Sequence, residues 1–501
     1  MNKTDVRQLV LDVSYLKSAL SSADDSHLDA EELHLDSLTL VWLMMTIERR
    51  IGRRVSVTQP VTVDSLHLSI VGENSAADSP ASSGVEVLDR LVEVENLNDP
   101  SAYYEHLRTT SPIALYPARH LDTLFGAEYY CFVSRYAEAR YIMTSPLFRV
   151  PDLGPLFPQG DDPRVNRMHQ LFANNVLALN PPLQTERRRL LTSLLSAGAA
   201  EQLREITERL CEEAVASVVG RLQAGDEVDV HAALSEKVAL ETIATFLGVS
   251  PEDAVRLKPF ASDLIDASHP VRDKRTMATA VEAVDALQQH FSGLLAERVR
   301  SPRDDLASRL GAAVVGDQVD ERDVVDVLMG LWITGFLSTA AGIDTAVVNW
   351  ARDRALFAAA NESPAGLRGY VNESLRLDPP LPTSGAIREA TTDIELGGVT
   401  LPRGTQVIIL FGAVNRDPEV FEHPEKFLPL RNNSQAMSFG VGAHYCVGAQ
   451  LARMEMSAVM TQLDRRLQAQ VEVTEAVRRK CLLPRMYDTL KIRISGTARQ
   501  T

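Results

Sequence analysis

The most informative stretch of the sequence is Ser438-Phe439-Gly440-Val441-Gly442-Ala443-His444-Tyr445-Cys446-Val447-Gly448-Ala449. Glycines at positions 440, 442 and 448 bracket its single cysteine, Cys446. Glycine has no Cβ, so such a loop can turn tightly and bring its backbone close to a flat ligand. A cysteine at its centre can supply a thiolate to a metal, and neighbouring backbone N–H groups can tune that metal. The stretch therefore favours a metal-binding thiolate over a buried free thiol.

A helix is predicted directly after this loop, over Ala449–Glu455, and a helix N-terminus stabilises a nearby negative charge. Loop and helix together resemble the Phe-Gly-x-Gly-x-His-x-Cys-x-Gly motif of the cytochromes P450. The resemblance covers about residues 85–501 and is strongest to soluble bacterial members. It implies a mainly α fold with a smaller β part, and a haem b whose iron is bound by Cys446. The cofactor-binding loop would include Phe439, Gly440 and Gly448.

Upstream of the loop, the chain is predicted to be helix-rich from about residue 190 to 376, then to form strands near 393–401 and 406–410. At the end of the helical part, Glu373-Ser374-Leu375-Arg376 resembles the family's Glu-x-x-Arg. The resemblance implies a buried structural ion pair, in which removing one partner costs roughly 3–5 kcal/mol. Lys426 stands where the family usually has a further arginine, which implies a weaker third member.

The haem carboxylates need cations or strong donors. The resemblance implies three cationic partners, His444, Arg388 and Arg188, and places Gln184 where the family commonly has histidine. An alternative for Arg188 and its neighbours is a solvated helix face. Seven further residues are expected, from the same resemblance, to line the substrate pocket: Trp332, Phe336, Thr383, Ser384, Ala386, Met486 and Tyr487.

A long apolar segment from Val324 to Trp350 is predicted to be the helix over the iron. Gly335 with Ser338 and Thr339 can open its hydrogen-bond ladder, because hydroxyls bond back to carbonyls one turn earlier. The family usually has an acid followed by threonine here, whereas this chain has Leu337-Ser338. Asp344-Thr345 offers a second register, but it would need a seven-residue deletion before Glu373. Ser338 and Thr339 are therefore the predicted catalytic hydroxyls, with water, substrate or peroxide as other sources of protons and oxidant.

Residues 74–84 are small and polar and are predicted to be a flexible linker between a segment of residues 1–73 and the larger domain of residues 85–501. In the first segment, Asp36-Ser37-Leu38 opens a helix with two apolar faces, more than a small core needs. This resembles acyl carrier proteins, in which the serine carries a 4'-phosphopantetheine arm, here on Ser37. Asp64-Ser65-Leu66 repeats the tripeptide, and His34 replaces a usual glycine. The alternative is a small all-α helical bundle in which Ser37 only caps a helix.

The composition excludes several classes of partner. A formal net charge of −16 argues against nucleic acid, which needs clustered lysine and arginine. No signal peptide or membrane span is expected, which predicts a cytoplasmic protein. The remaining cysteines form no CxxC pair and are expected to be buried thiols: Cys131, Cys211 and Cys481.

Three functions are compatible with these patterns. The first is a monooxygenase that hydroxylates an acyl or aminoacyl group tethered to its own Ser37, in natural-product biosynthesis. It implies a ferredoxin and ferredoxin reductase as electron donors, a phosphopantetheinyl transferase and an acyl-loading enzyme. The second is a free-substrate cytochrome P450 or peroxygenase with a degenerate docking domain. The third is a haem-bearing module that presents a carrier-bound intermediate without oxidising it.

Overall fold

The computed structural model describes residues 87, 90–117, 127–151, 163–194, 197–267, 274–383, 387–481 and 483–496. The chain divides into two units, Met1–Ser82 and Ser83–Thr501, and all of these residues belong to the second. Three of the predicted site residues lie outside the described residues: Ser37, Ser384 and Ala386. The predicted carrier domain and linker lie outside them as well.

The second unit is mainly helical, as predicted. Its earlier helices are α6 (Val94–Asn98), α7 (Ser101–Thr110), α8 (Tyr136–Thr144), α9 (Pro163–Asn174), α10 (Leu183–Leu194), α11 (Ala197–Gln223), the π-helix η2 (His231–Glu236), α12 (Lys237–Leu247), α13 (Pro251–Ala267), α14 (Lys274–Arg300) and α15 (Leu306–Val315). Its later helices are α16 (Glu321–Thr334), α17 (Leu337–Arg352), α18 (Arg354–Asn361), α19 (Pro364–Leu377), α20 (Phe411–Val414), the short 3-10 helix η3 (Gly442–His444) and α21 (Ala449–Arg466).

Local capping explains where several of these helices begin. Ser363 accepts a hydrogen bond from the backbone N–H of Gly366, and Pro364 occupies the first turn of α19. Asp320 and Asp305 cap α16 and α15 in the same way, through the backbone N–H groups of Arg322 and Ser308. These side chains satisfy N–H groups that have no partner within their own helix.

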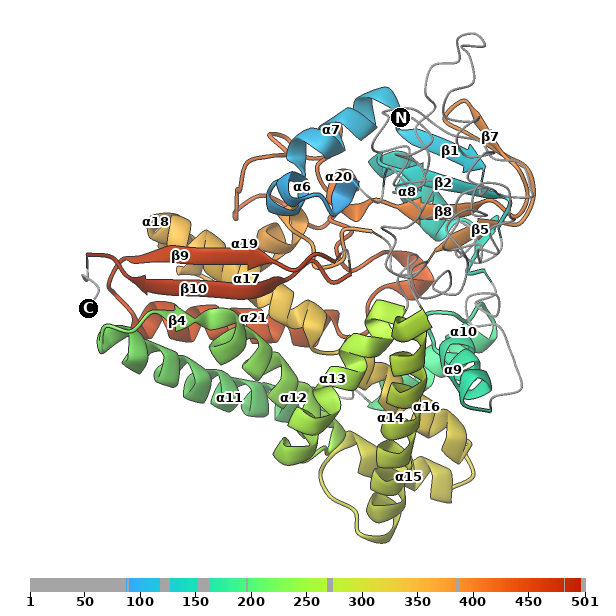
Figure 1. The fold of residues 1–501 in the computed structure, drawn as a ribbon, viewed down its shortest axis with the longest axis horizontal. Coiled ribbons are helices and arrows are strands. Elements are labelled where there is room, and N and C mark those ends of the chain that lie inside the picture. Colours follow the sequence, from blue (N-terminus) through green and yellow to red (C-terminus); the bar gives the residue numbers. More distant parts are fainter. Residues whose placement is uncertain are drawn as a thin grey trace, which may run out of the picture. The chain divides into compact units, whose positions relative to one another are not determined.

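The strands form three small sheets beside the helices (Figure 1). One sheet has the order β1-β2-β8-β5-β3, and only the β2–β8 pair is parallel. The others are β4-β10-β9 and the hairpin β6-β7. The bounds of the strands are β1 (Ile113–Pro117), β2 (Tyr129–Val133), β3 (Phe148–Arg149), β4 (Val228–Asp229), β5 (Arg388–Ala390), β6 (Ile394–Leu396), β7 (Val399–Leu401), β8 (Gln406–Ile409), β9 (Val471–Arg478) and β10 (Tyr487–Ile494). The two predicted strand regions are therefore confirmed as β6, β7 and β8.

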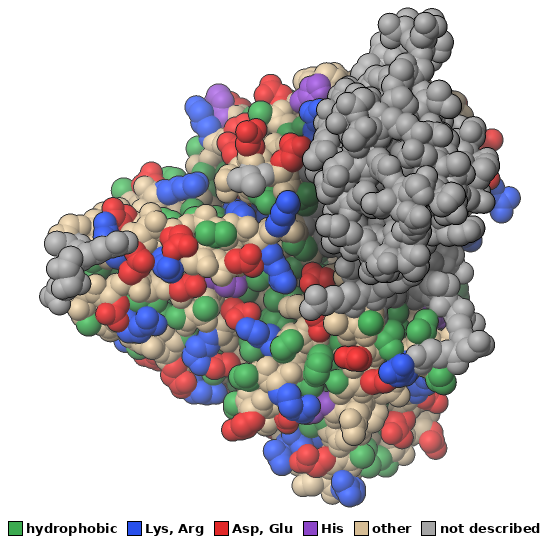
Figure 2. All heavy atoms as spheres, viewed as in Figure 1, with side chains coloured by type: hydrophobic (Ala, Val, Ile, Leu, Met, Phe, Trp, Pro, Cys, Tyr) green, Lys and Arg blue, Asp and Glu red, His purple; other side chains and the backbone are tan. Residues whose placement is uncertain are grey.

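Helix α17 lies in the middle of the helical part and links its two large apolar clusters. Leu337, Ala340 and Ala341 belong to the cluster built around α12 to α16, whereas Ile343 and Val347 belong to the cluster around α11, α19 and α21. Among the described residues, the stretch Glu321–Arg352 is long and apolar enough to cross a membrane by length and composition, and 72% of its most apolar window is buried inside the protein. On the face drawn in Figure 2, acidic and basic side chains are interspersed.

The Glu-x-x-Arg motif forms a buried ion pair at the end of α19. The Nε and Nη2 atoms of Arg376 each donate to Glu373 over 2.8 Å, and both side chains are fully buried. Arg431 supplies a second guanidinium, with its Nε 3.0 Å from Glu373 Oε1. The expectation that Lys426 would be the third member was wrong. Lys426 contributes only its carbonyl oxygen, which accepts from Arg376 and Arg431. Arg431 reaches Glu373 because the irregular segment after residue 421 folds back towards α19. No local sequence pattern could predict this contact.

Replacing Arg431 with alanine is expected to lower the free energy of unfolding by about 2–3 kcal/mol, because the buried Glu373 carboxylate loses a charged donor. Lys426→Ala is the matched control and should change it by less than about 0.5 kcal/mol, since its side chain is exposed. Urea unfolding followed by circular dichroism measures both. Equal effects of the two variants would contradict the assignment.

Candidate active site

The glycine-rich loop folds as a tight turn that leads into α21. The backbone N–H of Cys446 donates to the Phe439 carbonyl over 2.9 Å, which closes the turn. Gly440 and Gly442 have φ of 70° and 72°, a region that other residues rarely adopt, so the turn requires glycine at both positions. Helix α21 begins at Ala449, three residues after the cysteine. The predicted loop and the helix that follows it are both confirmed.

Opposing influences act on the Cys446 thiol. Burial raises its pKa, whereas hydrogen bonds from the backbone N–H groups of Gly448 and Ala449 and the charges of Arg188 and Arg453 lower it. The sulfur thus faces donors and cations that stabilise a thiolate once a metal offsets the cost of burial.

Arg453 is a component of this site that the sequence reading missed. Its guanidinium carbon lies 4.2 Å from the centre of the Phe439 ring, and its Nη1 donates to the Tyr445 hydroxyl over 3.1 Å. Its Nε donates to Asn372 on α19 over 2.8 Å. Arg453 lies seven residues after the cysteine and about one turn into the predicted helix, and that helical spacing is the only signal that could have found it.

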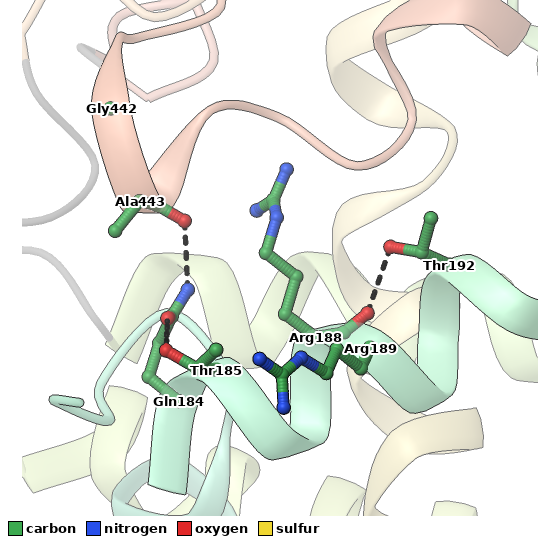
Figure 3. Close-up of a pocket in the computed structure, with 7 residues that line it drawn as sticks. All are labelled: Gln184, Thr185, Arg188, Arg189, Thr192, Gly442 and Ala443. Atoms are coloured by element: carbon green, nitrogen blue, oxygen red, sulfur yellow. Dashed lines mark hydrogen bonds between the residues drawn. The ribbon is translucent and has the colours of Figure 1, made fainter. Parts of the chain in front are cut away.

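Helix α10 faces the loop across a pocket of about 450 Å³, within the usual range for ligand sites. Gln184 Nε2 donates to the Ala443 carbonyl over 2.7 Å, and Arg188 and Arg189 line the same pocket (Figure 3). Arg187 instead pairs with Asp323 at the start of α16. The three arginines therefore have different surroundings, and the alternative of a solvated helix face does not describe Arg187, which is paired, or Arg188, which lines the pocket.

Arg388 adds positive charge beside Arg188, and His444 adds a neutral imidazole. Arg388 is 3% exposed, and burial lowers its pKa to about 10. Burial and the charges of Arg388 and Arg188 lower the pKa of His444 to about 4. The Nδ1 atom of His444 is buried and has no hydrogen-bond partner within the described part of the chain. Several cationic groups and an unsatisfied buried imidazole nitrogen close to a thiol fit a ligand that carries both a metal and carboxylates.

The predicted helix from Val324 to Trp350 is two helices, with a break between Thr334 and Leu337. The contacts expected from the sequence are present beside this break. The hydroxyls of Ser338 and Thr339 each lie 3.4 Å from a carbonyl one turn earlier, those of Thr334 and Gly335. A Cβ on Gly335 would lie 2.5 Å from the Leu331 carbonyl oxygen, so the close packing here requires glycine.

The alternative pair Asp344-Thr345 lies on the same helix but has structural partners. Asp344 is 1% exposed, and its Oδ2 lies 2.8 Å from Nδ1 of His231 in the π-helix η2. Thr345 Oγ1 lies 3.4 Å from Asp378 Oδ2 at the end of α19. Both side chains hold α17 to neighbouring elements, and neither adjoins the break at Gly335.

The described pocket candidates are mostly buried. Trp332, Phe336 and Met486 share one apolar cluster with Leu337, and Trp332 donates to the Leu257 carbonyl over 3.3 Å. Trp332 and Phe336 have no exposed surface, so in this structure they lie in the core and not on the surface of a cavity. Tyr487 packs in the other cluster, beneath Arg478, and Thr383 is buried.

Comparison with known proteins agrees with this arrangement. The model of the family described as Cytochrome P450 matches residues 367–483. The chain is 30% identical over 292 residues to nocardicin C N-oxygenase of Nocardia uniformis subsp. tsuyamanensis, an alignment covering 58% of this chain and 71% of that relative. It is 27% identical over 412 residues to cytochrome P450 BJ-3 of Bradyrhizobium diazoefficiens, covering 79% and 94%.

Among solved structures, P450BioI in complex with an acyl carrier protein ligated to hexadec-9Z-enoic acid has the same fold, with a TM-score of 0.70 at 24% identity over 80% of this chain and 99% of that one. With fold, loop and relatives in agreement, the chain belongs to the cytochrome P450 family. It is a haem-dependent monooxygenase, and so an oxidoreductase, which sets aside the non-oxidative alternative.

The His231–Asp344 pair should make stability depend on pH. Burial opposes charge on His231, but its bond to Asp344 outweighs burial and raises its pKa. Its stabilising effect is therefore complete below the ordinary histidine pKa of about 6.5 and lost as pH rises through the higher folded value.

The free energy of unfolding of the wild type, compared with that of His231→Gln, should fall by on the order of 1 kcal/mol between pH 6 and pH 8.5. Denaturant titrations at several pH values measure this difference. When Asp344→Asn is present in both proteins, the pH dependence of the difference should disappear. A difference that grows with pH would contradict the pairing.

Proposed function

We propose that this chain oxidises, by hydroxylation, an acyl or aminoacyl group that a phosphopantetheine arm on Ser37 carries into the haem pocket of the same protein. The observation that carries the oxidative part is the Cys446 loop, with its donors, facing the cationic groups of α10 and β5. The tethered substrate rests on the resemblance of Asp36-Ser37-Leu38 to a carrier protein. Tethering raises the effective concentration of a substrate and requires no affinity for it in free form.

In this proposal Cys446 binds the haem iron, and Arg188, Arg388, His444 and Gln184 hold the haem carboxylates. Bound haem supplies the activation of dioxygen that inserts one oxygen atom into a C–H bond. The backbone N–H groups of Gly448 and Ala449 hold negative charge at the sulfur. Phe439, braced by Arg453, covers one side of the loop. Gly440 allows the tight backbone turn that leads to Cys446.

Ser338 and Thr339 are the proposed proton-handling groups. Both hydroxyls bond weakly to carbonyls at the helix break, so each can turn towards a water or a substrate atom at small cost. No carboxylate precedes them, because Leu337 stands there and is buried in the apolar cluster. Proton supply then depends on these hydroxyls, on water or on a polar group of the tethered substrate.

The fold likeness to P450BioI gives limited support to the carrier hypothesis. That protein was solved with an acyl carrier protein bearing a sixteen-carbon acyl chain, so this fold accepts a carrier-bound substrate in at least one case. Electrons would come from a ferredoxin and its reductase, the usual donors of bacterial members of the family. A phosphopantetheinyl transferase and an acyl-loading enzyme complete the set of proposed partners, in the cytoplasm.

A second candidate function is a peroxygenase or free-substrate monooxygenase. The observation in its favour is Leu337, because an apolar residue before Ser338 removes the usual acid from the path of protons. A peroxide oxidant already carries the protons and electrons that this path would deliver. In this case residues 1–73 serve only docking or stability.

The carrier proposal predicts that intact-protein mass spectrometry, after incubation with coenzyme A and a phosphopantetheinyl transferase of broad specificity, detects one added arm. Ser37→Ala should abolish the addition, because its hydroxyl is the proposed acceptor. Ser65→Ala is the matched control, since Asp64-Ser65-Leu66 repeats the same tripeptide, and it should still gain the arm. No addition to the wild type would leave the second candidate function as the better one.

Cys446→Ser should abolish the absorption band that thiolate-ligated haem gives with carbon monoxide in the reduced state, because serine offers no thiolate to the iron. Cys211→Ala is the control, as Cys211 is buried between α11 and α21 and lies outside the loop. It should keep the band and lose only stability. Retention of the band in Cys446→Ser would overturn the ligand assignment.

A further inference from the structure

The end of α19 carries a carboxylate that the proposed chemistry does not use. Asp378 caps α19 and is 18% exposed at its side chain. Two guanidiniums converge on it: Arg485 Nε lies 2.6 Å from Oδ1, and Arg478 Nη2 bonds to Oδ2. Thr345 Oγ1 lies 3.4 Å from Oδ2. One carboxylate therefore joins three segments that are distant in the sequence.

Both arginines belong to the hairpin of β9 and β10. Arg478 is the last residue of β9 and pairs with Tyr487, the first residue of β10. Arg485 lies near the end of the connection between these strands, two residues before β10. Asp378 thus binds the connection, residues 479–486, at both of its ends.

The connection carries predicted pocket residues at its downstream end. Met486 follows Arg485 directly, is 3% exposed and packs in the cluster that contains Phe336 and Leu337 beside the helix break. Tyr487 lies against Arg478, whose guanidinium carbon is 4.0 Å from the centre of the ring. A shift of Arg485 would therefore move Met486, in the cluster that includes Phe336 and Leu337, and a shift of Arg478 would move Tyr487 in the neighbouring cluster.

The Asp378 carboxylate also lies at the start of a second segment that carries a predicted pocket residue, Thr383. Asp378 begins the run Asp378-Pro379-Pro380-Leu381-Pro382-Thr383. The backbone N–H of Arg485 donates to the Pro380 carbonyl over 2.7 Å, and Arg485 Nη1 donates to the Asn96 carbonyl over 3.2 Å. The segment that ends in Thr383 and the connection that ends in Met486 are therefore tied to each other as well as to α17.

The charge balance at Asp378 favours a permanently ionised group. Burial alone would raise its pKa, but the charges of Arg478 and Arg485 and their hydrogen bonds outweigh burial and lower it. The carboxylate stays charged at any pH at which the enzyme would work, so the junction does not loosen by protonation.

We propose that Asp378 is a specificity-determining positioning residue: by holding Arg478 and Arg485, it fixes residues 479–481, 483–486 and 378–383 as walls of the substrate pocket. The inference rests on the proposed function, because it takes Thr383, Met486 and Tyr487, predicted from the sequence to line the substrate pocket, as neighbours of the substrate oxidised there. Asp378 acts through the two arginines, and the side chains that contact its carboxylate belong to the β9–β10 hairpin and to Thr345 of α17.

The test uses the full-length, haem-loaded protein and two spectroscopic probes that bind haem iron, imidazole and a phenyl-substituted imidazole. Imidazole needs only the iron, whereas the phenyl ring also needs a preformed apolar wall. In Asp378→Asn, the affinity for imidazole should stay within about twofold, and that for the phenyl derivative should fall about tenfold as the wall loses its order. Amide hydrogen exchange in residues 479–486 should increase.

Asp464→Asn is the matched control. Asp464 is similarly exposed, at 21%, and binds Arg354 and the Trp350 indole, but it lies near the far end of α21 from Cys446. It should lower stability without changing the ratio of the two affinities. Asp378→Glu should restore part of the ratio, because the carboxylate is retained.

If Asp378→Asn does not fold, Arg485→Lys replaces it, as it keeps the charge and loses the fixed fork of the guanidinium. An unchanged affinity ratio in the folded variant, or an equal change in Asp464→Asn, would overturn the proposal and leave Asp378 a stabilising residue only. Amide hydrogen exchange reports on the order of the β9–β10 connection whether or not haem binds. A wild-type protein without the thiolate signature would therefore contradict the proposed function, while increased exchange in Asp378→Asn would still support the positioning role.

Discussion

The buried carboxylate of Glu373 is the interaction on which the haem-side structure depends. It accepts from Arg376, from Arg431 and from the backbone N–H of Leu428, so three charged or polar donors converge on one fully buried group. Arg376 in turn donates to the carbonyls of Asn415 and Pro424. Because an unpaired charge at this depth would be very costly, the irregular segment from residue 415 to 431 must keep its course around α19.

That course determines where the cysteine loop begins. Asn415 donates to the Ser438 hydroxyl over 2.9 Å and accepts from the Met437 backbone, and Ser438 donates to the Leu375 carbonyl over 2.8 Å. The ion network thus reaches the first residue of the loop through a short series of hydrogen bonds. From there, the Phe439–Cys446 turn and the start of α21 fix the sulfur. The position of Cys446 is therefore set from two sides, by this network and by the helix that follows.

A second network of the same kind holds the other side of the helical core. Asp378, five residues after Glu373, gathers Arg478, Arg485 and Thr345, as Glu373 gathers Arg376 and Arg431. The helix α19 therefore ends in two carboxylates with separate tasks. One orders the segment that leads to the proposed iron ligand, and the other orders the segments expected to face the substrate. Haem binding and substrate selectivity should therefore respond to different substitutions.

The sequence alone determined the cysteine loop, the helix after it, the Glu373–Arg376 pair, the late strands and the opening of the helix at Gly335. The loop and the opening of the helix follow from local chemistry, namely glycine at positive φ and hydroxyls that bond back to carbonyls one turn earlier. The Glu373–Arg376 pair was instead implied by the resemblance to the cytochromes P450. Only the tertiary structure decided that Arg431, not Lys426, completes the ion network, that Asp344 pairs with His231, and that Trp332 and Phe336 are core residues. These features depend on which distant segments come into contact. Burial and charge pairing are set by all the residues around a side chain, and when those residues come from remote parts of the chain, no single stretch of sequence shows a pattern that predicts them.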